Sequence, residues 1–529
     1  MITLSGIRLP LGATQRDAFD AACSMAHIPA ASVIDAKLRR VSYDARRRDI
    51  ATVCSVVLSL ANPEEERSLA ARYAFVHYAE KRPLQPALGV EKLAGRPVVA
   101  GFGPAGMFAA YLLSMYGYRP LVLERGGAMN ERVRAVEDFF SGGALDAGCN
   151  VQFGEGGAGT FSDGKLTTRI NDPLCDFVLE AFARFGAPED ILVRSKPHIG
   201  TDRLRAVVCA VRAAILENGG EIRFNTKLDG LRMQNGALRG VCANGQAIET
   251  QALLLACGHS ARDTFALLRD SGLRLEAKPF SVGARIEHLQ ADVDRSLYGE
   301  AAGDPRLPHG EYTLATHIGG RGVYTFCMCP GGSVVPAASE RGGVVTNGMS
   351  NYRRDGVNAN AALVVSVDGA DFGGDPFAAM DYQRTLEQKA FSMAGGDYRA
   401  PACDVGGFLA ERVSLRPGRV APSYARGVTA CDFDALLGRQ LTQTMRAGLR
   451  AFSKKLACFG DGGAVLTGPE TRTSSPVRIA RGEAREADGV RGVYPCGEGA
   501  GYAGGIMSAA VDGIKSALAV MERFAPPAE

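Results

Sequence analysis

The run GFGPAG at residues 101–106 has the spacing GxGxxG, a pattern that binds the phosphates of nucleotides. Gly101 permits a tight turn, Gly103 lets the backbone approach a pyrophosphate, and Gly106 lets a helix pack closely on a strand. Glu124 follows roughly 20 residues later, where an acid accepts hydrogen bonds from the ribose hydroxyls of an adenosine. The glycines and the acid together predict a dinucleotide-binding site.

Four other side chains are the predicted catalytic residues, and Arg262 is a fifth candidate near them. His259 can exchange a proton near neutral pH, and Lys165 ends a second glycine-rich loop. Arg472 could hold a substrate carboxylate through two parallel hydrogen bonds. Tyr502 lies in a glycine loop directly before an apolar helix. A purely structural role stays open for each of them: a histidine that caps a turn, an arginine in an ion pair, or a tyrosine that packs on a ring.

Alternating strands and helices are expected to position these residues. We predict buried parallel strands at 98–100 and 120–123, joined by a helix over 107–115. A helix over 203–218 precedes strands at 221–231, 236–243 and 247–256, with Asn244-Gly245 as a hairpin turn. The last of these strands ends at Gly258, and another at 492–498 ends at Glu498. A final helix from Ile506 to about Phe524 completes an α/β fold.

The glycine-rich stretch 153–166 is predicted to touch the same ligand, because a backbone without side chains can approach phosphates closely. The glycines at 499–505 precede the final helix, whose positive end would point at the ligand. Residues 276–465 lack a nucleotide fingerprint and are predicted to form an inserted β/α substrate domain, or cap. Cys327 and Cys329 would share one face of a strand there, either as a redox pair or as buried structural thiols.

Residues 1–90 are predicted to form a separate α+β unit with the element order βαββα of a ferredoxin-like sandwich. Strands are expected at 2–9, 32–46 and 52–61. The first helix is expected over 17–27, and a second starts at Asn62-Pro63 and continues through Leu69, Tyr73 and Val76. Residues 81–95 would be the linker. The dinucleotide-binding domain would then comprise 95–275 and 466–529.

A basic patch in this unit is either a solvated face balanced by neighbouring acids or a surface for RNA or an acidic partner. Its members are Lys37, Arg39, Arg40, Arg46, Arg47 and Arg48.

The composition is that of a globular protein: 529 residues with 46% hydrophobic and 22% charged residues. A net charge of +3 gives no overall case for binding nucleic acid or a membrane surface. No apolar run approaches a membrane span, and no apolar signal core stands at the start, so a cytoplasmic location is expected. The 13 cysteines are scattered without a CxxC, which argues against a metal site or a disulfide framework.

In these residues, the chain resembles a poorly characterised family of FAD-dependent dehydrogenases from bacteria and plastids. The resemblance implies the two-dinucleotide-fold architecture of glutathione-reductase-like flavoproteins. The matching segments lie between about residues 95 and 529 and include FGEGGAGTFSDGKLTTR, YTFCMCPGG, ETRTSSPVRI and YPCGEGAGYAGGI. The resemblance implies noncovalent FAD and a Rossmann-like FAD-binding domain. Residues expected to contact the cofactor are Gly101, Gly103, Pro104, Ala105, Gly106, Glu124, Arg125, Gly156, Gly157, Gly159, Ser162, Lys227, Leu228, Gly258, Gly497, Glu498, Gly504, Gly505 and Ile506.

Three functions remain open at this stage. The first is an FAD-dependent oxidoreductase that moves a hydride to or from a small molecule, with an anionic substrate as one option because of Arg472. The others are a flavoenzyme that acts on RNA through the basic N-terminal unit and a redox-sensing flavoprotein without turnover. No second GxGxxG occurs between a strand and a helix, so NAD(P)H would have to visit the substrate cleft as an electron donor.

Overall fold

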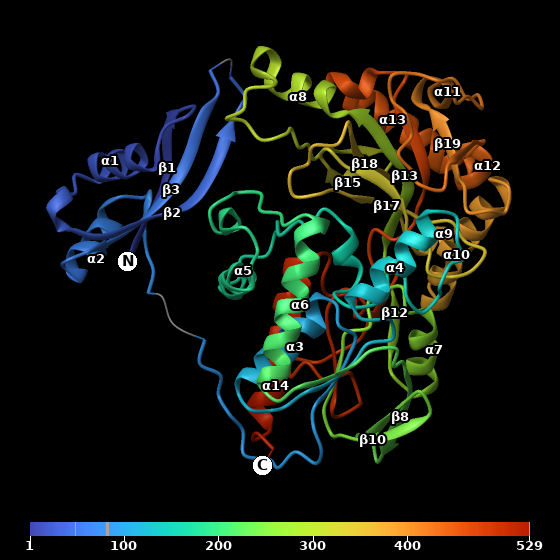
Figure 1. Cartoon of the computed structure of the whole chain (residues 1–529), viewed down its shortest axis with the longest axis horizontal. Coiled ribbons are helices and arrows are strands. Elements are labelled where there is room, and N and C mark those ends of the chain that lie inside the picture. Colours follow the sequence, from blue (N-terminus) through green and yellow to red (C-terminus); the bar gives the residue numbers. More distant parts are fainter. Residues whose placement is uncertain (48, 81–83, 528–529) are drawn as a thin grey trace.

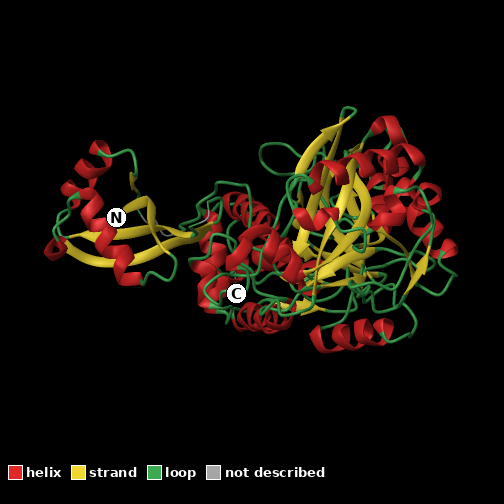
Figure 2. Ribbon diagram, turned by 90° about the horizontal axis from the view of Figure 1, so that it is seen from above, coloured by secondary structure: helices red, strands yellow, loops and turns green. Residues whose placement is uncertain are grey.

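The computed structural model describes residues 1–47, 49–80 and 84–527 and is built around three main sheets (Figure 1). The fold is mixed α/β, as predicted. A four-stranded sheet belongs to the N-terminal unit, a five-stranded sheet carries the GxGxxG turn, and a seven-stranded sheet belongs to the inserted region. The N-terminal unit projects from the rest of the molecule (Figure 2).

The N-terminal unit has the element order βαββαβ and the sheet order β2-β3-β1-β4, with every neighbouring pair antiparallel. Asn62 caps the second helix through the amide of Glu64, at the predicted start. That helix ends at Arg72, and Val76 lies in an added strand rather than in the helix as predicted. The elements are β1 Ile2–Pro10, α1 Gln15–Ala26, β2 Val33–Asp44, β3 Ala51–Leu60, α2 Pro63–Arg72 and β4 Val76–Tyr78.

Acidic partners neutralise several cations of the basic patch. Lys37 pairs with Asp35 at 2.8 Å and Arg46 with Asp44 at 2.8 Å. Arg39 reaches Asp176 of α5 at 2.8 Å, so this side of the unit faces the rest of the chain. Nearby, the Val41 amide donates to the Val193 carbonyl at 2.6 Å, and the Ser195 amide donates to the Val41 carbonyl at 2.9 Å. The predicted patch member Arg48 lies outside the described residues.

The described part of the predicted linker packs on the C-terminal helix and is not a free spacer. The hydroxyl of Tyr116 donates to the Leu84 carbonyl at 2.9 Å. The Gly89 amide donates to the Met521 carbonyl at 2.7 Å, and Glu91 pairs with Arg523 at 3.0 Å. Residues 81–83 lie outside the described part of the chain.

The central parallel sheet has the order β23-β11-β5-β6-β7. Alternate residues point to opposite faces: Val99 and Leu254 pack against helices α3, α6 and α14, which lie side by side in Figure 1, whereas Val98 and Leu253 pack against the meander β8–β10. Burial on both faces explains the uniformly apolar strands. The elements are β5 Val98–Ala100, α3 Pro104–Met115, β6 Leu121–Leu123, α6 Thr201–Glu217, β7 Glu221–Arg223, β8 Leu228–Gln234, β9 Ala237–Ala243, β10 Gln246–Glu249, β11 Leu253–Leu255, β23 Val493–Pro495 and α14 Ile506–Arg523.

Two predicted strands each prove to be two elements in different sheets. The prediction 221–231 divides into β7 and β8, because Asn225 adopts a left-handed backbone (φ 51°) between them. The prediction 247–256 divides into β10 and β11 around Thr250, whose hydroxyl donates to the Arg96 carbonyl at 2.8 Å. The hairpin turn at Asn244-Gly245 is confirmed: both residues have positive φ (46° and 75°), as a tight turn between antiparallel strands requires.

The seven-stranded sheet of the inserted region has the order β14-β15-β18-β13-β21-β19-β20. Helices α10, α12 and α13 contribute to its apolar core. The predicted boundary at 465/466 falls inside β21, a strand of this sheet. The strands of this sheet are β13 Phe280–Leu289, β14 Ala315–Ile318, β15 Arg321–Cys329, β18 Asn358–Val367, β19 Ala400–Asp404, β20 Val428–Ala430 and β21 Val465–Glu470. Strands β16 Ser333–Pro336 and β17 Thr346–Met349 form a separate two-stranded sheet.

The remaining elements are α4 Met129–Phe140, α5 Leu174–Arg184, α7 Arg262–Asp270, β12 Leu275–Ala277, α8 Gln290–Tyr298, α9 Gly369–Phe372, α10 Pro376–Met393, α11 Val405–Leu409, α12 Phe433–Leu437, α13 Arg439–Ser453 and β22 Val477–Ile479. Within the described ranges, no helix combines the length and the apolar character needed to span a membrane.

Candidate functional site

A cavity lies between the carboxyl ends of the parallel strands and the seven-stranded sheet. Strands β5, β6, β11 and β23 bring their following residues to one edge, because all four run in the same direction. Ligands of open α/β sheets bind at such an edge. Residues that follow these strands and line the cavity are Gly101, Glu124, Gly258 and Gly497; those that line it from the inserted region are Phe326, Cys327, Asn347, Glu470, Arg472 and Thr473.

The GxGxxG turn has the close contacts that its spacing predicts. Gly101 has a φ of 102°, and a Cβ on Gly106 would lie 1.9 Å from the Gly101 carbonyl oxygen. A Cβ on Gly157 would lie 2.7 Å from the Cα of Gly103, so the second glycine loop fits directly against the turn. Gly103 is the N-cap of α3 and supplies no side chain to the first amides of that helix, which leaves them available to an anion.

Glu124 is buried and fastens three backbone segments together. Its Oε2 accepts from the Phe102 amide at 2.8 Å, and its Oε1 accepts from the amides of Gly126 and Gly154, both at 2.9 Å. These bonds join the GxGxxG turn to the end of β6 and to the glycine-rich loop. The carboxylate also lines the cavity, so contact with a ribose remains the prediction for it.

Most residues predicted to contact the cofactor line this cavity. They are Gly101, Gly103, Pro104, Ala105, Glu124, Arg125, Gly157, Gly159, Ser162, Leu228, Gly258, Gly497, Glu498, Gly504, Gly505 and Ile506. Gly106 instead serves the packing of α3 described above. Gly156 and Lys227 are not among the lining residues: a Cβ on Gly156 would face Thr160 and Val208, and the Lys227 ammonium pairs with Asp263 at 3.2 Å. Cofactor contact by these two stays a prediction.

A second helix N-terminus points at the same cavity. Gly505 is the N-cap of α14, with a φ of 127° and no side-chain cap, and Ile506 lines the wall. Asp512 of this helix accepts from the Gly497 amide at 2.8 Å and pairs with Arg481 at 2.8 Å. The helix is thereby tied to the end of β23, and its free amides favour negative charge nearby.

Lys165 lies in a charged cluster at the cap side of the cavity. Its ammonium pairs with Asp163 at 2.8 Å and with Glu311 at 3.5 Å. Arg354 bonds to the same two acids, each at 2.5 Å. Burial by itself would lower the pKa of Lys165, but the two carboxylates outweigh burial and raise it. Lys165 therefore stays a fixed positive charge and does not act as a general base.

His259 lines the cavity but does not titrate near neutral pH as predicted. Burial, together with the positive charges of Arg472, Arg262 and Lys278, lowers the pKa of its ring to about 3. Its Nε2 lies 3.9 Å from Oε1 of Glu498. Burial raises the pKa of Glu498 to about 7, against the opposing effect of Lys278. The group that can exchange a proton in this part of the cavity near neutral pH is therefore Glu498.

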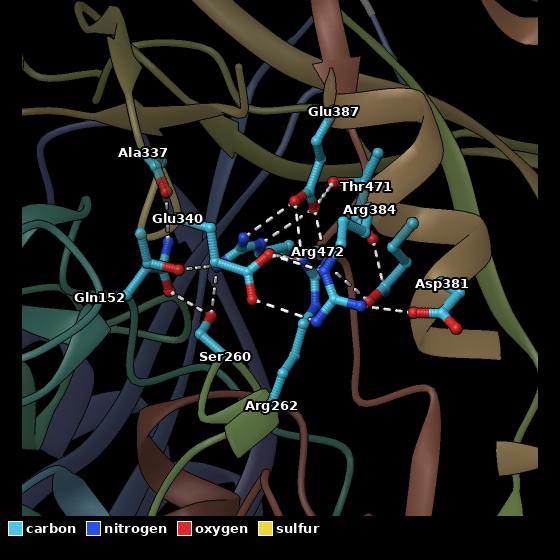
Figure 3. Close-up of polar contacts among 12 residues, drawn as sticks. Gln152, Ser260, Arg262, Ala337, Glu340, Asp381, Arg384, Glu387, Thr471 and Arg472 are labelled. Atoms are coloured by element: carbon cyan, nitrogen blue, oxygen red, sulfur yellow. Dashed lines mark hydrogen bonds and ion pairs between the residues drawn. The ribbon is translucent and has the colours of Figure 1, made fainter. Parts of the chain in front are cut away.

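The predicted grip of Arg472 on a substrate carboxylate does not fit the structure, because Glu387 occupies its bidentate edge (Figure 3). Nε donates to Oε1 of Glu387 at 3.1 Å and Nη2 to Oε2 at 3.0 Å. Nη1 donates to the hydroxyls of Ser260 at 2.8 Å and Ser339 at 2.5 Å. Arg262 also pairs with Glu387, at 2.9 Å, so two of the candidate arginines serve one buried ionic network.

Tyr502 does not form a wall of the cavity. Its ring is 37% exposed and lies under the guanidinium groups of Arg481, at 3.7 Å, and Arg478, at 5.4 Å. The glycine loop turns the ring toward these cations and away from the lining. The sequence position before α14 was correct, but the direction of the side chain depends on arginines that the spacing does not reveal.

Sequence reasoning missed the wall contributed by the inserted region. Phe326 and Cys327 come from β15, Asn347 from β17, and Glu470 from the end of β21. The sequence predicts a strand through Cys327 and Cys329, but that strand is irregular. Its pairing with β18 shifts between Phe326 and Cys329, and Cys327 has a φ of 44°. The prediction that both thiols lie on one face of a regular strand is therefore wrong.

The residues present fit a dinucleotide cofactor. Backbone packs closely around the glycines at 101 and 157, where a Cβ would lie 2.4 Å from the Ala256 carbonyl oxygen and 2.7 Å from the Gly103 Cα. The uncapped α3 terminus beside them supplies amide donors for a diphosphate. The uncapped α14 terminus at the other part of the cavity suits an electron-rich ring edge. Such a cofactor would run from Glu124 to the wall around Lys165 and Cys327.

Comparison with known proteins gives a family match and a full-length relative. Residues 279–473 match the family described as FAD-dependent protein, C-terminal domain-like. A protein of Clostridium beijerinckii, described as uncharacterized, is 45% identical over 490 residues, which is 92% of each chain.

Solved structures resemble the chain only weakly. Glycine oxidase from Bacillus cereus has a TM-score of 0.33 and 10% identity, covering 80% of this chain and 94% of its own. L-amino acid deaminase from Proteus vulgaris has a TM-score of 0.35 and 10% identity, covering 83% and 96%. Similarities at this level carry no argument about substrate.

Proposed function

The chain belongs to the family of the Clostridium beijerinckii relative and carries a C-terminal domain of the FAD-dependent protein type, and from that premise we propose that it is an FAD-dependent oxidoreductase. FAD binds without a covalent bond in the cavity at the carboxyl ends of the parallel strands, in a Rossmann-like domain. The observation that carries the proposal is the pair of uncapped helix N-termini, α3 and α14, that face one glycine-lined cavity.

Each part of the cavity has a defined task toward the cofactor. Glu124 and Arg125 lie at the adenosine end, where Glu124 accepts hydrogen bonds from ribose hydroxyls. The cradle around Gly103 and Gly157 and the first amides of α3 hold the diphosphate. The amides at the start of α14 stabilise negative charge at the far end.

When bound, FAD supplies the hydride chemistry, and the side chains near Lys165 set its surroundings. The fixed charge of Lys165 orients a negatively polarised group of the substrate. Glu498 holds or releases a proton near neutral pH because burial raises its pKa to about 7. His259 remains neutral and keeps its Nε2 toward Glu498. The substrate is a small molecule that enters between the parallel sheet and the inserted region, the route that a visiting NAD(P)H would also take.

The test is FAD content. Purified protein should show a flavin absorption spectrum, and denaturation should release FAD in roughly equimolar amount. Gly103→Val should abolish binding, because the new side chain enters the diphosphate space. Gly374→Val is the matched control, since Gly374 is exposed and has no heavy atom within 4 Å of a built Cβ. Protein that stays colourless and cannot be reconstituted with FAD would refute the proposal.

A further inference from the structure

Two cysteines stand in the wall of the cofactor cavity at a kink of β15. Cys327 lines the cavity, whereas Cys329 is fully buried behind it. In a regular strand, residues two apart have Cβ atoms roughly 6.6 Å from each other, too far for a disulfide, which needs about 4 Å. The shift in pairing after Phe326 and the left-handed backbone of Cys327 interrupt the regular strand at this point. The interruption turns the Cys329 thiol toward Cys327, and Cys329 Sγ lies 3.4 Å from the Cys327 carbonyl oxygen.

Several contacts hold this strained arrangement in place. Nη1 of Arg285 donates to the Cys327 carbonyl at 2.8 Å, and the Cys329 thiol donates to the same carbonyl at 3.4 Å. Arg285 is itself held by Glu470 at 2.9 Å. A Cβ on Gly348 would lie 2.8 Å from the Cys329 sulfur, so that glycine leaves room for the thiol. A left-handed non-glycine residue kept by such a network at a cavity wall is a feature of functional sites.

The surroundings of the two thiols are different. The neighbouring Cys329 thiol, with the positive charges of Arg285 and Lys165, lowers the pKa of Cys327 below its ordinary value, against burial and the negative charge of Asp163. The same contact with Cys327, together with burial, raises the pKa of Cys329 well above its ordinary value. Cys327 is thus the more nucleophilic, half-buried thiol at the cavity wall, and Cys329 is its buried, protonated neighbour.

We propose that Cys327 and Cys329 are a redox-active dithiol that reacts with a low-molecular-weight disulfide substrate, with Cys327 as the attacking thiolate and Cys329 as the resolving thiol. This inference rests on the proposed function and names a substrate class for it. The geometry supports the order of attack, because Cys327 alone of the two lines the cavity.

The exchange balances in atoms and electrons. The Cys327 thiolate attacks one sulfur of the substrate disulfide, which forms a mixed disulfide and releases the first thiolate. The sulfur of Cys329 then attacks that of Cys327, gives its proton to a leaving thiolate and releases the second half of the substrate. The substrate gains two electrons and the pair becomes a disulfide. FAD, when bound in its reduced form, would supply the hydride equivalent, two electrons and one proton, that restores the thiolate and the thiol.

The probe is oxidised glutathione, and the readout is the mass of one peptide. Trypsin releases residues 322–341, which contain both thiols and no other cysteine. In wild-type protein this peptide should lose two hydrogens and become resistant to alkylation. Cys329→Ser should instead trap glutathione on Cys327, and Cys327→Ser should give neither product. Cys242→Ser, a half-buried thiol of β9 outside the cavity lining, is the matched control and should behave as wild type.

A pH profile separates a functional thiolate from a structural thiol. At about pH 7, iodoacetamide should alkylate Cys327 roughly tenfold faster than Cys242, because a larger fraction of Cys327 is in the thiolate form. Lys165→Met should shift the pH dependence of Cys327 alkylation to higher pH, because it removes a positive charge that stabilises the thiolate. A peptide 322–341 that remains reduced, or equal rates for the two cysteines, would overturn the inference.

FAD content of the same samples keeps the two proposals distinguishable. Bound FAD with a peptide that stays reduced refutes the dithiol alone, whereas a disulfide in protein that binds no FAD refutes the proposed function. Cys327→Ala serves beside Cys327→Ser to show that the lost reaction does not come from misfolding, provided that both retain FAD.

Discussion

Arg472 and Glu387 face each other through two parallel hydrogen bonds, Nε to Oε1 at 3.1 Å and Nη2 to Oε2 at 3.0 Å. The pair joins the segment after β21 to helix α10. With its other nitrogen held by Ser260 and Ser339, the arginine links the inserted region to the loop after β11. The contact is a structural junction beside the cavity, and substitutions there should act on stability before they act on chemistry.

Arg472→Ala should therefore lower the free energy of unfolding by about 3 kcal/mol, because Glu387 loses one of the two arginines that pair with it in a buried site. Glu387→Ala should cost more, since Arg472 then loses its paired acid and Arg262 keeps only its pair with Glu340. Denaturant unfolding measures both values. Arg399→Ala, which breaks an exposed pair with Asp397, is the control and should change stability by less than about 1 kcal/mol. Equal losses for Arg472→Ala and Arg399→Ala would contradict this role.

Glu124→Ala should affect both folding and cofactor binding. The substitution leaves the amides of Phe102, Gly126 and Gly154 without their acceptor, a loss of about 2–3 kcal/mol of stability in FAD-free protein. FAD affinity should fall as well, because the ribose loses its carboxylate. Urea unfolding and flavin titration test the two effects separately. An unchanged affinity would show that Glu124 only supports the turn.

Glu498 should make stability depend on pH. Burial raises its pKa to about 7 from an ordinary value of 4.5, so the folded state binds the proton more tightly than the unfolded state. Its contribution to stability is therefore fully present below about pH 4.5 and is lost as pH rises through about 7, by about 3 kcal/mol.

His259 has the opposite sign over about pH 3 to 6.5, because its folded pKa is lowered. The informative quantity is therefore the unfolding free energy of wild type minus that of Glu498→Gln, in FAD-free protein. This difference should fall between about pH 5 and pH 8. A difference that stays constant with pH would place the carboxyl in a solvated position.

Removal of residues 1–80 should leave FAD binding intact, because the cavity lining starts at Ala100. A cut at residue 95 should destabilise the protein, since it also removes the contacts of Leu84, Gly89 and Glu91 with α3 and α14 regions. Flavin content and thermal unfolding of the two truncations test this. Loss of FAD on removal of residues 1–80 would mean that the FAD-binding domain needs the N-terminal unit. The contacts that would then matter are those of Arg39 with Asp176 and of Val41 with Val193 and Ser195.

The sequence by itself determined the local structure of the nucleotide site, that is, its first strand, its glycine turn and the helix that follows. The strand, turn and helix around Gly101 to Gly106 are specified by residues within one short segment, so spacing alone located them. The same holds for the N-cap of α2 at Asn62 and for the hairpin at Asn244-Gly245, where side-chain or backbone chemistry acts over a few residues. Apolar runs likewise indicated the four inner strands that end at the cavity.

Only the tertiary structure decided what the polar candidates do. Arg472 has its partner Glu387 on α10, far away in the chain, and Tyr502 is turned aside by Arg481. Burial and neighbouring cations lower the pKa of His259 to about 3, whereas burial raises the pKa of Glu498 to about 7. The Cys329 thiol reaches the Cys327 carbonyl because β15 is kinked against β18. Charge, burial and strain of this kind arise from contacts between distant segments, which residue spacing does not encode.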